Sequence, residues 1–124
     1  MANLGKVIGF VPTKDGERAR LFFEQKLGLA FVSDDPFAMV MDSRGTMIRI
    51  VKVQDFQPAP YTVLGWEVPD IHATVTELRQ RGVRFEQYPF IHDKDLGIWI
   101  APGGAKVAWF KDPDGNVLSV SQHT

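Results

Sequence analysis

One charged residue lies inside an apolar stretch of this chain and could do chemistry there. Arg49 stands between Ile48 and Ile50, in a segment whose composition favours a β-strand. A guanidinium group on a largely buried strand needs an anion, either a carboxylate of the protein or a carboxylate or phosphate of a ligand. Glu67, in another apolar segment, could be the protein's own partner. The sequence leaves two interpretations of Arg49 open, a structural ion pair or a contact with an anionic or polar ligand.

The three histidines are the other candidates for acid–base or metal chemistry. His72 falls in the first turn of a predicted helix and His123 is the penultimate residue, so both are expected to be exposed. His92 lies beside Asp93 in a polar loop, where it could be a general base or a weak metal ligand. A solvated loop position is the stronger expectation for His92, and no second histidine is near enough in sequence to predict a two-His metal site.

Aromatic residues are frequent on the predicted strands, and some must face away from the core because alternate strand residues point to opposite sides. A cavity with aromatic walls and a few polar anchors is a common kind of small-molecule site. Trp99 and Trp109 are the best candidates for such a wall, since both lie near the flexible segment 102–104. Tyr61 and Ser119 could supply hydroxyl groups to the same ligand.

Composition excludes several functional classes. The chain has 14 basic and 15 acidic residues, which gives no electrostatic bias toward nucleic acid or an anionic membrane. It has no cysteine, so disulfides, thiolate metal ligands and a cysteine nucleophile are absent. No Ser–His–acid spacing and no phosphate-binding loop occur. Without a signal-like N-terminus or an apolar run of membrane-spanning length, the sequence predicts a cytoplasmic protein.

The chain contains an internal repeat. Residues 39–50 align with residues 109–120 at a constant spacing of 70 positions without a gap, and each copy has the pattern of strand, Asp-x-x-Gly turn and strand. Upstream, residues 7–10 recur as residues 63–66. Such self-similarity indicates one module that has been duplicated. A duplicated module also suggests a ligand site at the seam between the copies.

Hydrophobic periodicity predicts the same element order in both copies. In module one, about 6–53, we expect a strand at 6–11 stopped by Pro12, a helix from Asp15 to Leu27, and strands at 29–33, 37–41 and 46–53. The proline-rich stretch 54–61 is a linker. In module two, about 62–122, the expected elements are strands at 63–68 and 83–88 around a helix from Asp70, then strands at 97–101, 105–111 and 117–122.

This order predicts the fold class. Two βαβββ modules have too few helices for a doubly wound parallel sheet, so we expect an α+β fold. The modules should form a curved mixed sheet, a cup, with the helices on its outer face. We expect residues 1–124 to be a single domain.

The chain resembles the vicinal oxygen chelate superfamily, which includes glyoxalase I, bleomycin resistance proteins and extradiol dioxygenases. The resemblance covers about residues 6–122. It rests on the doubled βαβββ order, on Phe22-Phe23 followed by Leu27-Gly28, on the helix entry at 68–70 and on the turn at 111–116. It implies a glyoxalase/bleomycin-resistance-like domain, and because relatives of this size often pair, a homodimer.

The resemblance also implies where a metal would bind. Metal-dependent members place His or Glu at four cup-facing positions, which fall here at Ile8 or a neighbour, at Arg49, at Val63 or Leu64, and at Ser119. None of these is a usual ligand for a divalent metal ion, and the fixed charge of Arg49 would repel one. We therefore predict that the familial metal site is absent and expect no cofactor.

Three functional hypotheses follow. The first is a metal-free protein that binds a small organic molecule in an aromatic-lined cup, with no nucleic acid or membrane partner; its ligand-binding candidates are Arg49, Trp99, Trp109, Ser119, Glu67, Tyr61 and His92. The second is a glyoxalase-like lyase or isomerase, or a dioxygenase, with a displaced metal site that uses His92, Glu67 or Asp93. The third is a structural module whose cup is filled by its own side chains.

Overall fold

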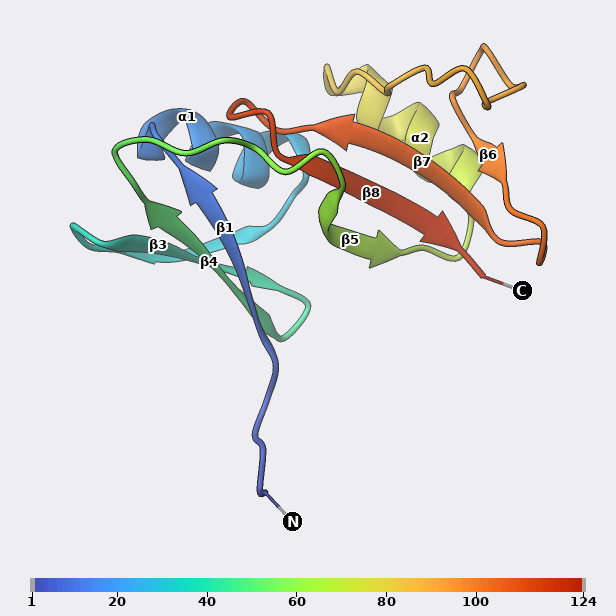
Figure 1. Cartoon of the computed structure of the whole chain (residues 1–124). Helices are drawn as coiled ribbons and strands as arrows, with labels where there is room; N and C mark the ends of the chain where they lie inside the picture. The colour runs from blue at the N-terminus through green and yellow to red at the C-terminus, as the bar shows by residue number, and fades with distance from the viewer. Residues whose placement is uncertain (1, 124) are drawn as a thin grey trace. The chain divides into compact units, whose positions relative to one another are not determined.

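The computed structural model describes residues 2–123 and contains two compact units, which divide between Gln57 and Pro58 (Figure 1). Both units have the element order strand, helix and three strands. Each unit forms its own mixed four-stranded sheet. The predicted α+β class with two βαβββ modules is therefore confirmed.

The first unit builds its sheet in the order β1-β4-β3-β2, in which β1 and β4 are parallel and the other pairs antiparallel. Its elements are β1 (Ile8–Thr13), α1 (Gly16–Arg20), a π-helix (Leu21–Lys26), β2 (Ala30–Asp34), β3 (Ala38–Ser43) and β4 (Thr46–Lys52). The predicted helix start is confirmed, because the Asp15 carboxylate accepts the backbone N–H of Arg18 at 3.2 Å. The predicted end of the first strand at Pro12 is wrong. Proline has no backbone N–H to donate, but β1 is an edge strand, where one side of the strand has no neighbour to bond. The strand therefore continues through Pro12.

A π-helix replaces the second half of the predicted first helix. The N–H of Leu27 bonds to the carbonyl of Phe22 at 3.1 Å, five residues back rather than four. Phe22 and Phe23 are both buried and meet edge to face with ring centroids 5.3 Å apart. The wider turn accompanies the burial of two consecutive aromatic rings, and a pattern of apolar residues at i, i+3 and i+4 cannot distinguish it from an α-helix.

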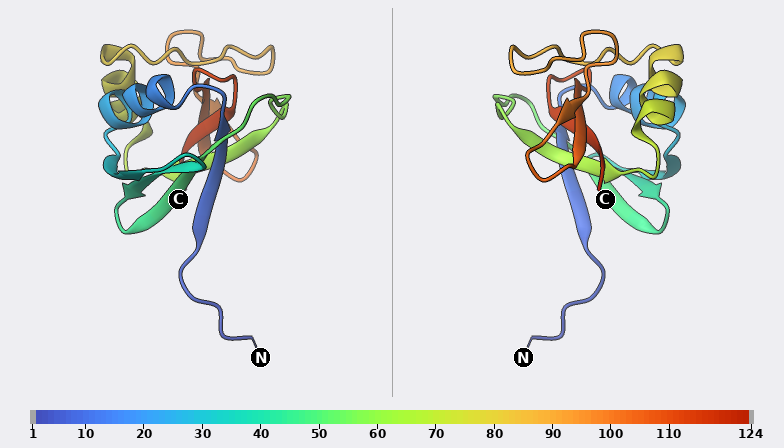
Figure 2. Two further views of the ribbon diagram at one scale, coloured as in Figure 1. Left: turned by 90° about the vertical axis from the view of Figure 1, so that its left-hand side faces the viewer. Right: turned by 90° about the vertical axis from the view of Figure 1, so that its right-hand side faces the viewer.

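The second unit repeats the topology in the order β5-β8-β7-β6. Its elements are β5 (Thr62–Glu67), α2 (Ile71–Gln80), β6 (Trp99–Ile100), β7 (Lys106–Lys111) and β8 (Val117–Gln122). The helix begins at the predicted cap, where the Asp70 carboxylate accepts the N–H of Ala73 at 3.1 Å. The helix α2 packs against β7 and β8 (Figure 2). Its buried side chains are those of Ile71 and Val75.

The predicted strand at 83–88 is wrong. Its backbone connection to β7 consists of a single bridge, Phe85 to Phe110, and a bond from the N–H of Glu86 to the carbonyl of Trp109 at 2.8 Å. The short strand β6 pairs with the other end of the same edge of β7. Because two segments share one edge of β7, neither forms a long ladder.

No helix among residues 2–123 is long and apolar enough to cross a membrane.

Candidate functional site

Four aromatic side chains of the second unit contact one another, and we call Tyr88, Phe90, Trp99 and Trp109 the aromatic cluster. Trp109 is its centre, with ring centroids 5.6 Å from Tyr88, 5.7 Å from Phe90 and 5.8 Å from Trp99. Tyr88 and Phe90 stack at 5.5 Å, while most other pairs meet edge to face. Both arrangements are favoured by the ring quadrupoles. The two tryptophans singled out in the sequence are thus brought together.

Strand alternation explains how the cluster is displayed. Phe110, the neighbour of Trp109 on β7, is fully buried, whereas Trp109 is only partly buried. Successive side chains of a strand point to opposite faces, so Trp109 lies on the face away from the buried Phe110. Tyr88 and Phe90 reach this face from the segment that follows α2, which is held to β7 by the bond from Glu86 to Trp109.

A cavity of about 260 Å³ lies beside the cluster. The indole N–H of Trp109 donates to the hydroxyl of Thr62 at 3.1 Å, which fixes the indole at the cavity wall. Tyr61 is 67% exposed and Phe90 is 50% exposed, so aromatic faces are accessible from solvent. The cavity is lined by Pro60, Tyr61, Thr62, Tyr88, Phe90, Trp109 and Val117. None of these residues carries a charge at neutral pH, and three of them carry hydroxyl groups.

A sequence model of the Glyoxalase/Bleomycin resistance protein/Dioxygenase superfamily matches residues 5–120. The chain belongs to this superfamily. The resemblance that the sequence suggested is therefore confirmed. Among functionally curated proteins, none matches the chain.

Solved structures support the same fold. TnmS3, an antibiotic binding protein from Streptomyces sp. CB03234, is 25% identical with a TM-score of 0.76, over 100% of this chain and 99% of that one. A protein assigned to the glyoxalase family from Bacillus anthracis is 20% identical with a TM-score of 0.76, over 100% of both chains. A member of the superfamily from Sphaerobacter thermophilus DSM 20745 is 22% identical with a TM-score of 0.75, over 98% of both.

Ser119 lies next to the aromatic cluster on the sheet of this glyoxalase-like chain. It pairs with Trp109 across β7 and β8, and with Gly65 across β5 and β8. A Cβ atom added to Gly65 would come within 2.6 Å of the Ser119 hydroxyl oxygen. The absence of a side chain at position 65 therefore leaves the room that the Ser119 hydroxyl occupies.

Replacing Gly65 with alanine is expected to lower the free energy of unfolding by about 1–2 kcal/mol, because the new methyl group overlaps the Ser119 hydroxyl. Thermal or urea denaturation measures this loss. The double variant Gly65→Ala/Ser119→Ala should recover most of it, since the clashing oxygen is gone. Equal stability of the single variant and the wild type would show that Ser119 simply rotates away.

Arg49 belongs to the first unit and is half-buried on β4, paired with Phe10 on β1 and Val40 on β3. The pKa of Asp35, in the same unit, is lowered mainly by the backbone N–H groups of Ala38 and Phe37, and the charge of Arg49 contributes to this shift. Asp35 is thus a carboxylate of the first unit that the charge of Arg49 affects, and one that the sequence did not single out. The predicted pair of Arg49 with Glu67, a residue of the second unit, stays a prediction.

The remaining candidates lie outside the aromatic cavity. Glu67 is exposed at the end of β5, where it pairs with Ser121. His92 is exposed in a loop, and the neighbouring Asp93 carboxylate accepts the N–H groups of Asp95 and Leu96, so it caps that turn. The predicted exposure of His72 and His123 is confirmed.

Within residues 2–123, no group of three His, Asp or Glu side chains is placed so that it could hold a metal ion.

Sequence reasoning missed several residues of the cavity. The sequence predicts Tyr88 at the end of a strand, and it gives no direct signal of a binding role for Phe90, Thr62, Pro60 or Val117. The pattern Tyr88-Pro89-Phe90 carried one signal, because a proline favours an extended backbone in the residue before it. In an extended segment, residues two apart can face the same side.

Proposed function

We propose that this superfamily member binds a small organic molecule with an aromatic or amphipathic body on the aromatic cluster, without a metal ion. The single observation that carries the proposal is the accessible aromatic wall around Trp109. A cavity of this kind buries a flat apolar body, while a few hydroxyl groups orient it. The description of TnmS3 as an antibiotic binding protein supports a role in binding rather than in turnover.

Because the lining residues are uncharged, the part of the ligand that enters the aromatic cavity should be an uncharged aromatic surface. Burying a ligand charge against this wall would leave it without an ionic partner, which costs free energy. The hydroxyl groups of Tyr61, Thr62 and Tyr88 can donate to or accept from polar substituents at the rim. Ser119 adjoins the cluster, and Glu67 and His92 of the same unit stay proposed contacts for polar parts of a larger ligand. Arg49, in the first unit, stays a proposed contact for an anionic or polar group.

Nuclear magnetic resonance with 2-naphthol as the probe tests this proposal. The chain has three tryptophans, so three indole N–H signals report separately on Trp66, Trp99 and Trp109. We expect the signals of Trp99 and Trp109 to shift in a saturable way while that of Trp66 stays in place. Cyclohexanol, which has no aromatic face, should cause much smaller shifts. If 2-naphthol moved none of the three signals, or all of them equally, the aromatic cluster would not be a ligand site.

The absence of a resident metal and the pairing of two chains are also proposed. The metal-free state rests on the residues at the four familial positions, and the homodimer rests on the resemblance to small paired relatives and on Phe10, which is 59% exposed on the edge strand β1. Native mass spectrometry of protein purified without chelators should give the mass of two chains with no added ion. A bound metal in stoichiometric amount would favour the alternative of a metal-dependent lyase, isomerase or dioxygenase. A single-chain mass at micromolar concentration would contradict the dimer.

A further inference from the structure

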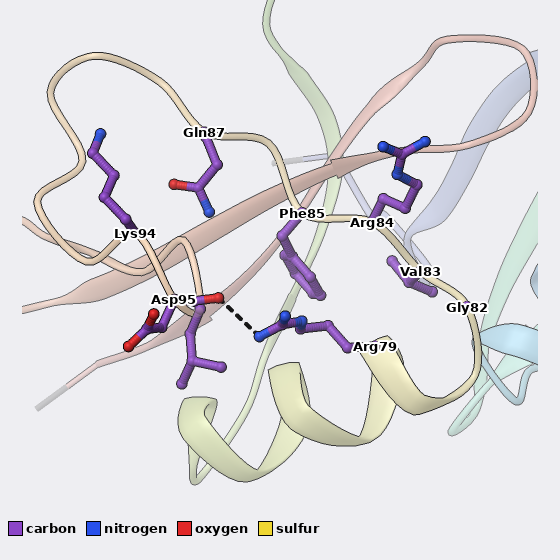
Figure 3. Close-up of a pocket in the computed structure, with 9 residues that line it drawn as sticks. Arg79, Gly82, Val83, Arg84, Phe85, Gln87, Lys94 and Asp95 are labelled. Atoms are coloured by element: carbon purple, nitrogen blue, oxygen red, sulfur yellow. Dashed lines mark hydrogen bonds between the residues drawn. The ribbon is translucent and has the colours of Figure 1, made fainter.

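A second cavity, of about 390 Å³, lies in the second unit between the end of α2 and the segment that follows it (Figure 3). We call it the basic cavity. It is lined by Arg79, Gly82, Val83, Arg84, Phe85, Gln87, Lys94, Asp95 and Leu96. It shares no lining residue with the aromatic cavity.

Three cationic side chains line the basic cavity against one carboxylate. The cations are Arg79, Arg84 and Lys94, and the acid is Asp95. The whole chain carries a formal net charge of −1, so this local excess of positive charge does not follow from composition. A concave surface with one sign of charge raises the local concentration of the opposite ion.

These three cationic side chains still have N–H groups that can bind an anionic ligand. Arg79 donates one N–H to the backbone carbonyl of Asp95 at 2.8 Å, which leaves most of its five donors for other partners. Among residues 2–123, neither Arg84 nor Lys94 has a carboxylate partner. Glu77 pairs with Arg81 at 2.9 Å and Glu86 with Lys111 at 3.4 Å. Asp95, in contrast, is the acid that lines the cavity.

The uncharged Gln87 side chain of the lining lies close to the backbone of Gly97. A Cβ atom on Gly97 would lie 3.0 Å from the side-chain amide nitrogen of Gln87, so this amide rests against the Gly97 backbone. Gly97 has a φ of +73°, a conformation that glycine adopts without steric cost. In Figure 3 the Gln87 amide and the Arg79 guanidinium extend into the space between the loop and the helix, while Lys94 and Arg84 lie on its two sides with their charged ends pointing away from α2.

An apolar wall accompanies the charges. Val83 is buried, and Phe85 and Leu96 are partly buried, so the cavity offers carbon surface beside its cationic rim. Inorganic phosphate alone would leave this wall exposed to water. A ligand that joins an anion to a small apolar group would use both parts of the lining.

We propose that the basic cavity binds the phosphate group of a small organic phosphate monoester. The phosphate binds the Arg79 guanidinium, Arg84 and Lys94 add positive charge from the two sides of the cavity, and the organic group packs against Phe85 and Leu96. A phosphate monoester carries close to two negative charges at neutral pH, which matches the excess of cations better than a single carboxylate does. The Gln87 amide supplies a neutral donor to the same anion.

Titration of the whole chain with phenyl phosphate, followed by nuclear magnetic resonance of the backbone amides, tests the proposal. We expect saturable shifts at the amides of residues 79–87 and 94–97, weaker saturation with inorganic phosphate, and no shifts at these amides with phenol, which should act only on the aromatic cluster. Raising the salt concentration should weaken phenyl phosphate binding, because screening reduces the attraction of exposed charges. Shifts produced equally by phenol would overturn the proposal, and so would shifts confined to the aromatic cluster.

A matched pair of double variants separates a specific site from overall charge. Arg84→Gln/Lys94→Gln removes two charges at the cavity, and we expect it to weaken phenyl phosphate binding at least tenfold. Lys6→Gln/Arg44→Gln removes two exposed charges of the first unit, which do not line the cavity, and should change affinity less than twofold. Equal losses in both double variants would show that the anion responds only to net charge.

Discussion

The variant Trp109→Ala is expected to bind aromatic ligands about thirtyfold more weakly than the wild type, equivalent to about 2 kcal/mol. Trp109 contacts the rings of Tyr88, Phe90 and Trp99, and so its removal takes away the centre of the proposed binding wall. Titration with 2-naphthol, read from the indole signal of Trp99, measures the loss. Its magnitude is that of a central aromatic residue in a buried contact surface.

Two variants separate the ring from its hydrogen bond. Trp109→Phe keeps an aromatic face but loses the N–H that donates to Thr62 at 3.1 Å, and Thr62→Val removes the acceptor of the same bond. Both should weaken binding by only about threefold to tenfold, because one neutral hydrogen bond contributes about 1 kcal/mol net. A thirtyfold loss in Thr62→Val would instead show that the orientation of the indole dominates.

The control for these variants is Trp66→Phe. Trp66 pairs with Val120, which is buried, whereas Trp109 pairs with the partly buried Ser119, so the two tryptophans lie on opposite faces of the sheet. We expect Trp66→Phe to bind 2-naphthol with unchanged affinity. If Trp109→Ala bound as tightly as the wild type while its amide spectrum showed a native fold, the aromatic cluster would have no role in binding.

The sequence predicted the modules well because their signals are local. Helix caps at Asp15 and Asp70 are set by hydrogen bonds to residues three positions on, and the 70-residue repeat marks two hairpins that form within short stretches of chain. The contact between the rings of Trp99 and Trp109 could also be anticipated, since both residues lie on predicted strands near one loop. Such features need no knowledge of distant contacts.

The parts that the sequence did not predict depend on long-range packing. Tyr88 and Phe90 join the cluster only because the segment after α2 folds back onto β7, and this depends on β6 occupying the rest of that edge. The basic cavity likewise collects Arg79 from a helix and Lys94 from a loop. Periodicity describes one element at a time, so it could not bring these side chains together.

The two repeat copies differ sharply in how their turns are built, and this difference sets the largest expected effect on stability. In the second copy the buried Asp112 carboxylate accepts the backbone N–H groups of Asp114 and Asn116, both at 2.9 Å, and the side-chain amide of Asn116 at 2.8 Å. In the first copy Asp42, which lies 70 positions earlier, accepts the N–H of Gly45 at 3.2 Å from an exposed turn. The second turn thus relies on a carboxylate for groups that water cannot reach.

Asp112→Ala is expected to lower the free energy of unfolding by about 3 kcal/mol, because it leaves buried donors without an acceptor. Asp42→Ala is the matched control from the other copy, and we expect it to cost about 0.5 kcal/mol or less. Urea denaturation of both variants measures the difference. Similar losses in the two variants would show that both aspartates act only through turn propensity.

Because the Asp112 carboxyl is buried, the difference in stability between the wild type and the variant Asp112→Asn should depend on pH. Burial raises the pKa of Asp112 above its ordinary value, and this outweighs the hydrogen bonds from Asn116 and Asp114, which lower it. A raised pKa in the folded state means that the folded protein binds a proton more readily than the unfolded chain in the interval between the two pKa values. The wild type should therefore gain stability relative to Asp112→Asn as the pH falls through the folded-state pKa, and lose that gain as the pH rises through it. Urea denaturation of both proteins at several pH values down to about 4 checks the sign. A wild type that loses stability relative to Asp112→Asn as the pH falls would mean that the hydrogen bonds to the charged carboxylate outweigh its burial.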